Sequence, residues 1–180
     1  MNKKLTLTVY AAMMAAITCV ATMIIKVPTV GTEGYVNIGD AAVLLSAWLL
    51  FLPYGPLAAG IGSGLADLLL GYASYVPGTT VIKFLMAFVA YLIYKAGKKT
   101  KMPQVVTLVI SAIVAEIIMI AGYLFYEAFL LGYGWVALES VISNVIQGGT
   151  CIVLGVLMKL ALSLTPLERQ INSLKAEKRS

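Results

Sequence analysis

Long apolar segments separated by short polar stretches run through the whole of this 180-residue sequence. About 20 apolar residues suffice to cross a bilayer as a helix. The hydrophobic fraction is 61% and the mean hydropathy is +0.94, whereas soluble domains are about 45–50% apolar. The sequence therefore predicts an all-α integral membrane protein, a single membrane domain of six transmembrane helices over 1–180. The predicted spans are 5–25, 40–52, 56–72, 79–95, 105–131 and 136–162.

The first two segments each allow a second interpretation. The run 5–25 follows two lysines, as in a signal peptide, but it exceeds the usual apolar length of about 7–15 residues, so a retained span is expected. The run 40–52 is short for a hydrocarbon core about 30 Å thick. It either begins nearer Asn37 or forms a partly inserted hairpin with the third segment, around the turn at 53–56.

The Lys and Arg residues predict the orientation. In a six-span topology all 13 basic residues except Lys26 and Lys83 fall on one side, and basic loops stay in the cytoplasm. Both termini are therefore expected to be cytoplasmic, with a cytosolic tail at 165–180. Within this tail, Thr165, Pro166 and Glu168 match the start of a helix with a capping box, which predicts a short helix. A partly inserted second and third segment would leave the termini on the same side.

The residue types exclude several classes of function. The sequence has no His, which removes imidazole bases and most zinc sites. Cys19 and Cys151 lie in separate apolar segments and are interpreted as core residues, so no metal and no cofactor are expected. The basic residues have no interleaved aromatic residues, which argues against nucleic acid. No Gly-x4-Gly-Lys motif occurs, so ATP-driven work would need another chain.

Asp67 and Lys83 are ionisable residues inside apolar segments. Each would cost about 2.5–3.5 kcal/mol at the centre of a bilayer, so such residues are expected to face the protein interior and to have a function. Counted from the outer ends of their spans, both lie roughly 6–8 Å deep on neighbouring helices. This placement allows them to pair.

Further polar residues recur in the fifth and sixth segments. They are Glu116, Tyr123 and Glu127 on the fifth and Glu139, Asn144 and Gln147 on the sixth. Their spacings place the three residues of the fifth segment, and the last two of the sixth, on one helix face. With outer aromatic residues such as Tyr75 above them, they predict a ligand pocket in the outer half of the membrane. The alternatives are hydrogen bonds that only join helices and an aromatic belt at the membrane surface.

Small residues form a second pattern. Ala11 with Ala15, and Ala12 with Ala16, give two small-x3-small registers on the first segment, and Gly60 with Gly64 gives a GxxxG on the third. Such faces let helices approach closely, either within the protein or against a partner.

Three stretches together carry a family resemblance. They are "GYVNIGDAAVLLSAWLLFLPYGPLAAGIGSGLADLLLGYASYVPGTTVIK", "AGYLFYEAFLLG" and "ALESVISNVIQG". The chain resembles the vitamin-binding S components of energy-coupling factor (ECF) transporters, particularly the group with pyridoxine, hydroxymethylpyrimidine and riboflavin-type members. The resemblance covers the whole chain. Its N-x-G-D start adds Asn37 and Asp40 to the expected substrate-binding residues.

The resemblance implies a six-helix binder in the bacterial cell membrane that captures a vitamin from outside, beneath the first outer loop. It implies that the protein is not an enzyme. Vitamin B6 or a hydroxymethylpyrimidine is the expected ligand type. The implied partners are a transmembrane coupling subunit and two ABC-type ATPases, with Ala11, Ala12, Ala15 and Ala16 as the docking surface.

Two other classes of function remain as alternatives. One is an autonomous secondary transporter or exporter in which Asp67 and Glu116 relay protons, although no repeat between the two halves supports it. The other is a membrane scaffold or an intramembrane enzyme, for which no catalytic constellation is found.

Overall fold

The computed structural model describes residues 3–29, 31–100, 102–166, 168, 170, 171 and 173. Over these residues the chain forms six α-helices, which confirms the all-helical prediction, and one short hairpin that was not predicted. In chain order they are α1 (Lys3–Ile24), β1 (Lys26–Pro28), β2 (Tyr35–Asn37), α2 (Gly39–Leu49), α3 (Tyr54–Leu69), α4 (Val76–Gly97), α5 (Gln104–Phe125) and α6 (Leu138–Ser163). A π-helical turn (Tyr126–Leu130) extends α5, and a 3-10 turn (Gly134–Ala137) precedes α6.

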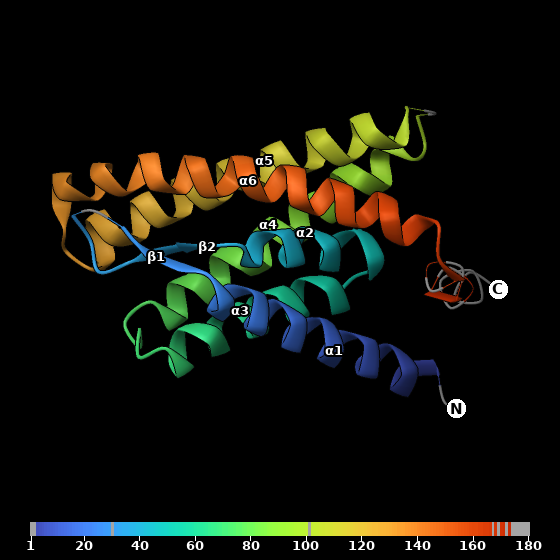
Figure 1. The fold of residues 1–180 in the computed structure, drawn as a ribbon, viewed down its shortest axis with the longest axis horizontal. Helices are drawn as coiled ribbons and strands as arrows, with labels where there is room; N and C mark the ends of the chain where they lie inside the picture. Colours follow the sequence, from blue (N-terminus) through green and yellow to red (C-terminus); the bar gives the residue numbers. More distant parts are fainter. Residues whose placement is uncertain are drawn as a thin grey trace.

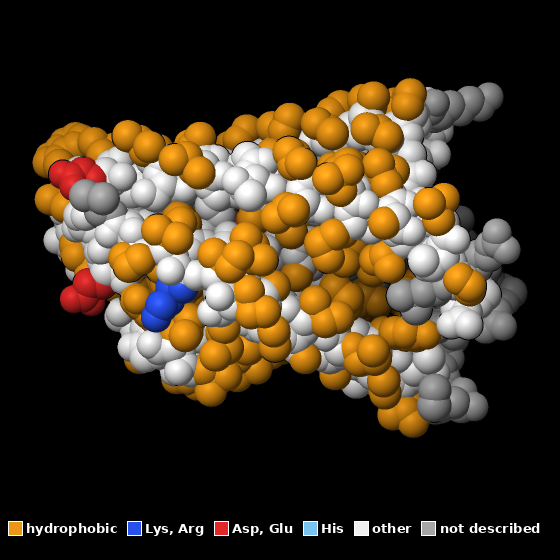
Figure 2. All heavy atoms as spheres, in the orientation of Figure 1, with side chains coloured by type: hydrophobic (Ala, Val, Ile, Leu, Met, Phe, Trp, Pro, Cys, Tyr) orange, Lys and Arg blue, Asp and Glu red, His pale blue; other side chains and the backbone are white. Residues whose placement is uncertain are grey.

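Four helical segments of the described chain are long and apolar enough to cross a membrane: Lys4–Ile24, Val76–Gly97, Gln104–Leu130 and Gly134–Ser163. Their outer surfaces are hydrophobic. On α1, for example, Leu5, Val9 and Met13 recur every fourth residue and are about half exposed. On the face shown in Figure 2, hydrophobic side chains cover the length of the bundle, and the visible charges gather at one end. Such a surface suits lipid contact.

The second predicted span has a different explanation. Helix α2 has 11 residues, all of them buried, and at 1.5 Å per residue it covers about 16 Å of a core about 30 Å thick. It is enclosed by α1, α3, α4 and α6, and its Trp48 donates a hydrogen bond of 3.0 Å to Ser111 Oγ of α5. The apolar run at 40–52 therefore reflects burial inside the protein.

The GxxxG of α3 serves internal packing. A Cβ at Gly60 would lie 2.7 Å from the Thr80 carbonyl oxygen of α4, and one at Gly64 would clash with the Thr80 hydroxyl. Between them, Gly62 faces the backbone carbonyl of Ala15 on α1. Glycines on both sides of α3 thus allow close packing with two neighbouring helices.

The start of α1 and the end of α6 lie at the same end of the bundle, and the β1–β2 hairpin lies at the other, which we call the hairpin end (Figure 1). The connections from α3 to α4 and from α5 to α6 also lie at the hairpin end (Figure 1).

The described residues of the tail are helical at Pro166, Glu168, Gln170, Ile171 and Ser173. The predicted capping box is absent from this part of the chain. The Thr165 hydroxyl donates to the Leu162 carbonyl oxygen at 2.7 Å, and Glu168 pairs with Lys159 of α6 at 2.6 Å. The rest of the predicted tail helix, 174–180, lies outside the described residues.

Candidate ligand pocket

The β1–β2 hairpin closes one end of the bundle. Its strands pair antiparallel, with Lys26 opposite Asn37, and its loop is tied by a hydrogen bond of 3.0 Å from the Thr29 amide to the Gly34 carbonyl. Inside the loop, Thr32 reaches α5 by donating to Glu127 at 3.1 Å. The loop is therefore attached to the helix across the bundle.

Asn37 joins the hairpin to α2 well inside the bundle. Its amide donates to Gln147 Oε1 of α6 at 2.6 Å, and its own Oδ1 accepts from the Gly39 amide at 2.7 Å. A side chain at Gly39 would collide with Thr22 of α1, which explains the glycine. Because β2 leads inward before α2 begins, the first turn of α2 starts at depth.

Asp40, in that first turn, is the centre of a buried polar network. Its Oδ1 lies 2.5 Å from Lys83 Nζ of α4, and its Oδ2 accepts from Gln147 Nε2 at 2.5 Å. Lys83 Nζ also lies 5.1 Å from the centre of the Tyr123 ring. The ion pair allowed by the sequence, Lys83 with Asp67, is thus wrong, because Lys83 pairs with Asp40.

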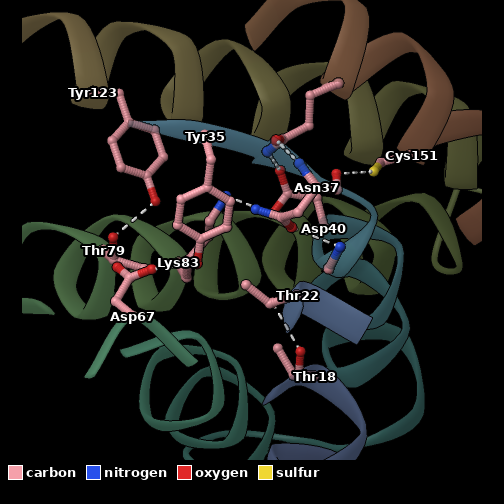
Figure 3. Close-up of polar contacts among 12 residues, drawn as sticks. Thr18, Thr22, Tyr35, Asn37, Asp40, Asp67, Thr79, Lys83, Tyr123 and Cys151 are labelled. Atoms are coloured by element: carbon pink, nitrogen blue, oxygen red, sulfur yellow. Dashed lines mark hydrogen bonds and ion pairs between the residues drawn. The ribbon is translucent and has the colours of Figure 1, made fainter. Parts of the chain in front are cut away.

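Asp67 instead accepts a hydrogen bond of 2.6 Å from Tyr35 of β2 through Oδ1. Burial, followed by the neighbouring Asp67 carboxylate, raises the pKa of Tyr35, so the phenol keeps its proton and remains a donor. The second oxygen of Asp67, Oδ2, is buried and has no partner among the described residues. Nearby, the hydroxyls of Thr79 and Tyr123 share a hydrogen bond of 2.9 Å. Figure 3 shows these side chains converging from β2, α3, α4 and α5.

Glu127 is a second centre of polar contacts. Its Oε1 accepts from Thr32 and from the Tyr75 hydroxyl, each at 3.1 Å, and its Oε2 accepts from Ser140 at 2.5 Å. Burial, followed by the Glu127 carboxylate, raises the pKa of Tyr75. One carboxylate therefore joins the hairpin loop to the starts of α4 and α6 with three hydroxyl donors.

These groups surround a narrow cavity beneath the hairpin that is partly open to solvent. Seven residues predicted from the sequence line it: Asn37, Asp67, Tyr75, Lys83, Tyr123, Glu127 and Asn144. Six lining residues were not predicted: Thr22, Thr29, Gly34, Tyr35, Ser63 and Thr79. Most of these carry a hydroxyl, which is too common in helices and loops to stand out. Tyr35 had a usable signal, since it lies two residues before the N-x-G-D stretch.

The remaining four predicted residues lie outside the cavity lining. Asp40 and Gln147 form the network beneath it. Glu116 is buried deeper, against Gly148 of α6. Glu139 is exposed, and its carboxylate lies beside Gly31 in the hairpin loop.

The cavity combines many hydrogen-bonding groups with aromatic walls. Polar groups of this kind orient a small ligand inside an otherwise apolar bundle. Within the described ranges, no three His, Cys, Asp or Glu side chains are grouped so that they could hold a metal ion. Hydrogen-bonding groups and aromatic rings in one cavity suit a small organic ligand.

Comparisons with known proteins agree with this architecture. The family model described as ECF-type riboflavin transporter, S component, matches residues 2–164. A protein of Pyrococcus woesei, known as an uncharacterized protein in gap 3′region, is 29% identical over 136 residues, which are 76% of this chain and 87% of that protein.

Two solved structures share the fold. The S component of a bacterial ECF transporter has a TM-score of 0.64 and 22% identity, covering 89% of this chain and 96% of that one. The S component for biotin from an ECF-type ABC transporter has a TM-score of 0.63 and 18% identity, covering 94% of this chain and 92% of that one.

Proposed function

The chain belongs to the ECF-type riboflavin transporter S component family, and from this we infer that the cavity beneath the β1–β2 hairpin is its vitamin site. S components are membrane proteins that bind a vitamin for uptake by an ECF transporter; they are substrate-binding subunits and not enzymes. The observation that carries the proposal is the convergence of polar side chains from the hairpin, α3, α4, α5 and α6 on one cavity beneath the hairpin. Polar side chains that served only to join helices would not need to surround a cavity.

We assign the predicted residues three roles. The seven that line the cavity would contact the vitamin directly. Asp40, Gln147 and Glu116 would support them, because the first two hold Lys83 and the inner end of the hairpin in place. Glu139, next to Gly31, would act on the hairpin loop rather than on the ligand.

The proposed topology has six membrane segments with both termini in the cytoplasm. Strand β2 and helix α2 together would cross the membrane from the outside to the inside, and α3 would cross back to the outside. The hairpin end would then face the outside of the cell membrane. The distribution of Lys and Arg supports this orientation, since all except Lys26 and Lys83 fall on the opposite side.

The proposed partners within the ECF module are a transmembrane coupling subunit and two ABC-type ATPases. The docking surface would lie on α1, where Ala12 and Ala16 are exposed, whereas Ala11 and Ala15 are half-buried. We therefore favour the Ala12/Ala16 register as the contact, with the Ala11/Ala15 register packing inside the protein.

The vitamin is proposed to be of the B6 or hydroxymethylpyrimidine type. Native mass spectrometry of the purified protein tests this directly, because a tightly bound vitamin would be retained. In detergent, a ligand at about 100 times its Kd should add about 2.7 kcal/mol of stability. A panel of water-soluble vitamins that leaves the melting temperature unchanged would contradict the proposal. Uptake that depends on co-expressed ATPase subunits would exclude an autonomous transporter with Asp67 and Glu116 as proton relay.

A further inference from the structure

The cavity and the network beneath it hold an excess of acidic groups. Asp40, Asp67, Glu116 and Glu127 are each at most 3% exposed. Lys83 is the one basic residue of the described chain that lines the cavity. The site therefore holds more carboxyl groups than ammonium groups.

The ammonium of Lys83 already has a counter-ion inside the protein. It lies 2.5 Å from Asp40 Oδ1, and the second oxygen of Asp40 is fixed by Gln147. An anionic ligand that used Lys83 would have to compete with Asp40 for it. Separating such a buried pair is unfavourable, because each ion has lost its water.

The acceptors of the cavity are not equally occupied. Glu127 receives three hydroxyl donors, from Thr32, Tyr75 and Ser140. Asp67 receives one well-formed hydrogen bond, from Tyr35, and in the described part of the chain no donor has hydrogen-bond geometry to its Oδ2, although the Thr79 hydroxyl interacts with this carboxyl group. Asp67 is 3% exposed and lines the cavity. A buried acceptor of this kind is costly when nothing donates to it.

From these three observations, and resting on the proposed vitamin site, we propose that the cavity selects ligands bearing an N–H donor or a cationic nitrogen. Asp67 Oδ2 accepts from that nitrogen, and ligands bearing a carboxylate or a phosphate are excluded. The rings of Tyr35 and Tyr75 line the same cavity, and the faces of aromatic rings attract cations, as the Tyr123 ring does for Lys83. Amines, aminopyrimidines and protonated pyridines fit this description.

Matched ligand pairs test the proposal with the full-length protein in detergent. Two comparisons are made by titration calorimetry and thermal shift. Pyridoxamine is compared with 4-pyridoxic acid, and 4-amino-5-hydroxymethyl-2-methylpyrimidine is compared with its phosphate ester. In at least one pair, the member without the carboxylate or phosphate should bind at least tenfold more tightly than its acidic counterpart. Equal or tighter binding of the acidic members would overturn the inference and leave the vitamin site standing. Binding of none of these compounds, nor of riboflavin or biotin, would overturn both.

Asp67→Asn is the variant that isolates the acceptor, since it keeps the shape of the side chain and an oxygen for Tyr35. Its affinity for the ligand without the acidic group should fall at least tenfold. The ratio between the affinities of that ligand and its acidic counterpart should also become smaller. Glu33→Gln is the matched control, because it removes an exposed acid on the hairpin loop and should leave both values unchanged. An Asp67→Asn protein that melts like the wild type and keeps the wild-type preference would refute the assignment. If that variant does not fold, the ligand pairs on the wild-type protein decide.

Discussion

Lys83 Nζ and Asp40 Oδ1 lie 2.5 Å apart inside the bundle and join the middle of α4 to the first turn of α2. Both side chains are at most 3% exposed, so neither charge can be compensated by water. The pair fixes the point at which the inward-leading hairpin becomes helix α2. This is the structural reason why an apolar segment keeps a lysine.

Replacing Lys83 by Met should destabilise the protein by about 3–5 kcal/mol, because Asp40 would remain as an unpaired buried charge. The unfolding free energy of the ligand-free protein in detergent measures this loss. The double variant Lys83→Met/Asp40→Leu should recover much of it, since no charge is left uncompensated. Additive effects of the two substitutions would contradict a coupled pair.

Glu127→Leu should loosen the hairpin over the cavity. It removes the acceptor shared by Thr32, Tyr75 and Ser140, and leaving a buried donor such as the Tyr75 hydroxyl unpaired costs roughly 1–3 kcal/mol. We expect faster hydrogen exchange at 29–36 and weaker vitamin binding by about tenfold or more. Ser140→Ala removes one donor and should have a smaller effect on both measurements. Unchanged exchange at 29–36 in Glu127→Leu would show that the hairpin is held by other contacts.

The helices could be predicted from the sequence because their apolar runs are long and their polar residues recur at helical spacing. Tyr123, Glu127 and Asn144 were found in this way, and all three line the cavity. The hairpin could not be predicted, because its strands have three residues each. This is too short to show an alternation of polar and apolar residues. Tyr35 was missed with it.

The partner of Lys83 was assigned wrongly for a related reason. Counting depth along helices put Asp67 at the level of Lys83, whereas Asp40 was the first residue of its predicted span, 40–52. In the structure β2 carries the chain inward before α2 begins, so that Asp40 reaches Lys83. A short extended segment of this kind changes the depth in the bundle of the residues that follow it. Hydropathy does not reveal such a segment.

Glu168→Gln should destabilise the end of α6. Lys159 is fully buried and lies 2.6 Å from Glu168, so the substitution leaves an ammonium without its counter-ion. The expected loss is on the order of 3 kcal/mol, measured by thermal unfolding. Lys99→Gln, at an exposed position, is the control and should change stability by no more than about 0.5 kcal/mol. Equal stability of both variants would mean that solvent or another group neutralises Lys159.

The two alanine registers of α1 should respond differently to bulky substitution. Ala11 and Ala15 are half-buried and pack against a cluster that includes Met14, and the Ala15 carbonyl faces Gly62 of α3. Trp at both positions would overpack this contact and should cost roughly 1–3 kcal/mol or more. Thermal unfolding should report the loss even without a partner.

Ala12→Trp/Ala16→Trp should instead leave the fold and vitamin binding intact, because both residues are exposed and lie on α1, away from the cavity lining. If this register is the docking surface, the added rings prevent close approach of a partner helix. The purified variant should bind its vitamin like the wild type, yet fail to copurify with the coupling subunit and fail in ATP-dependent uptake. Wild-type uptake by this variant would move the docking surface elsewhere, and loss of vitamin binding together with uptake would show that the Ala12/Ala16 register supports the pocket itself.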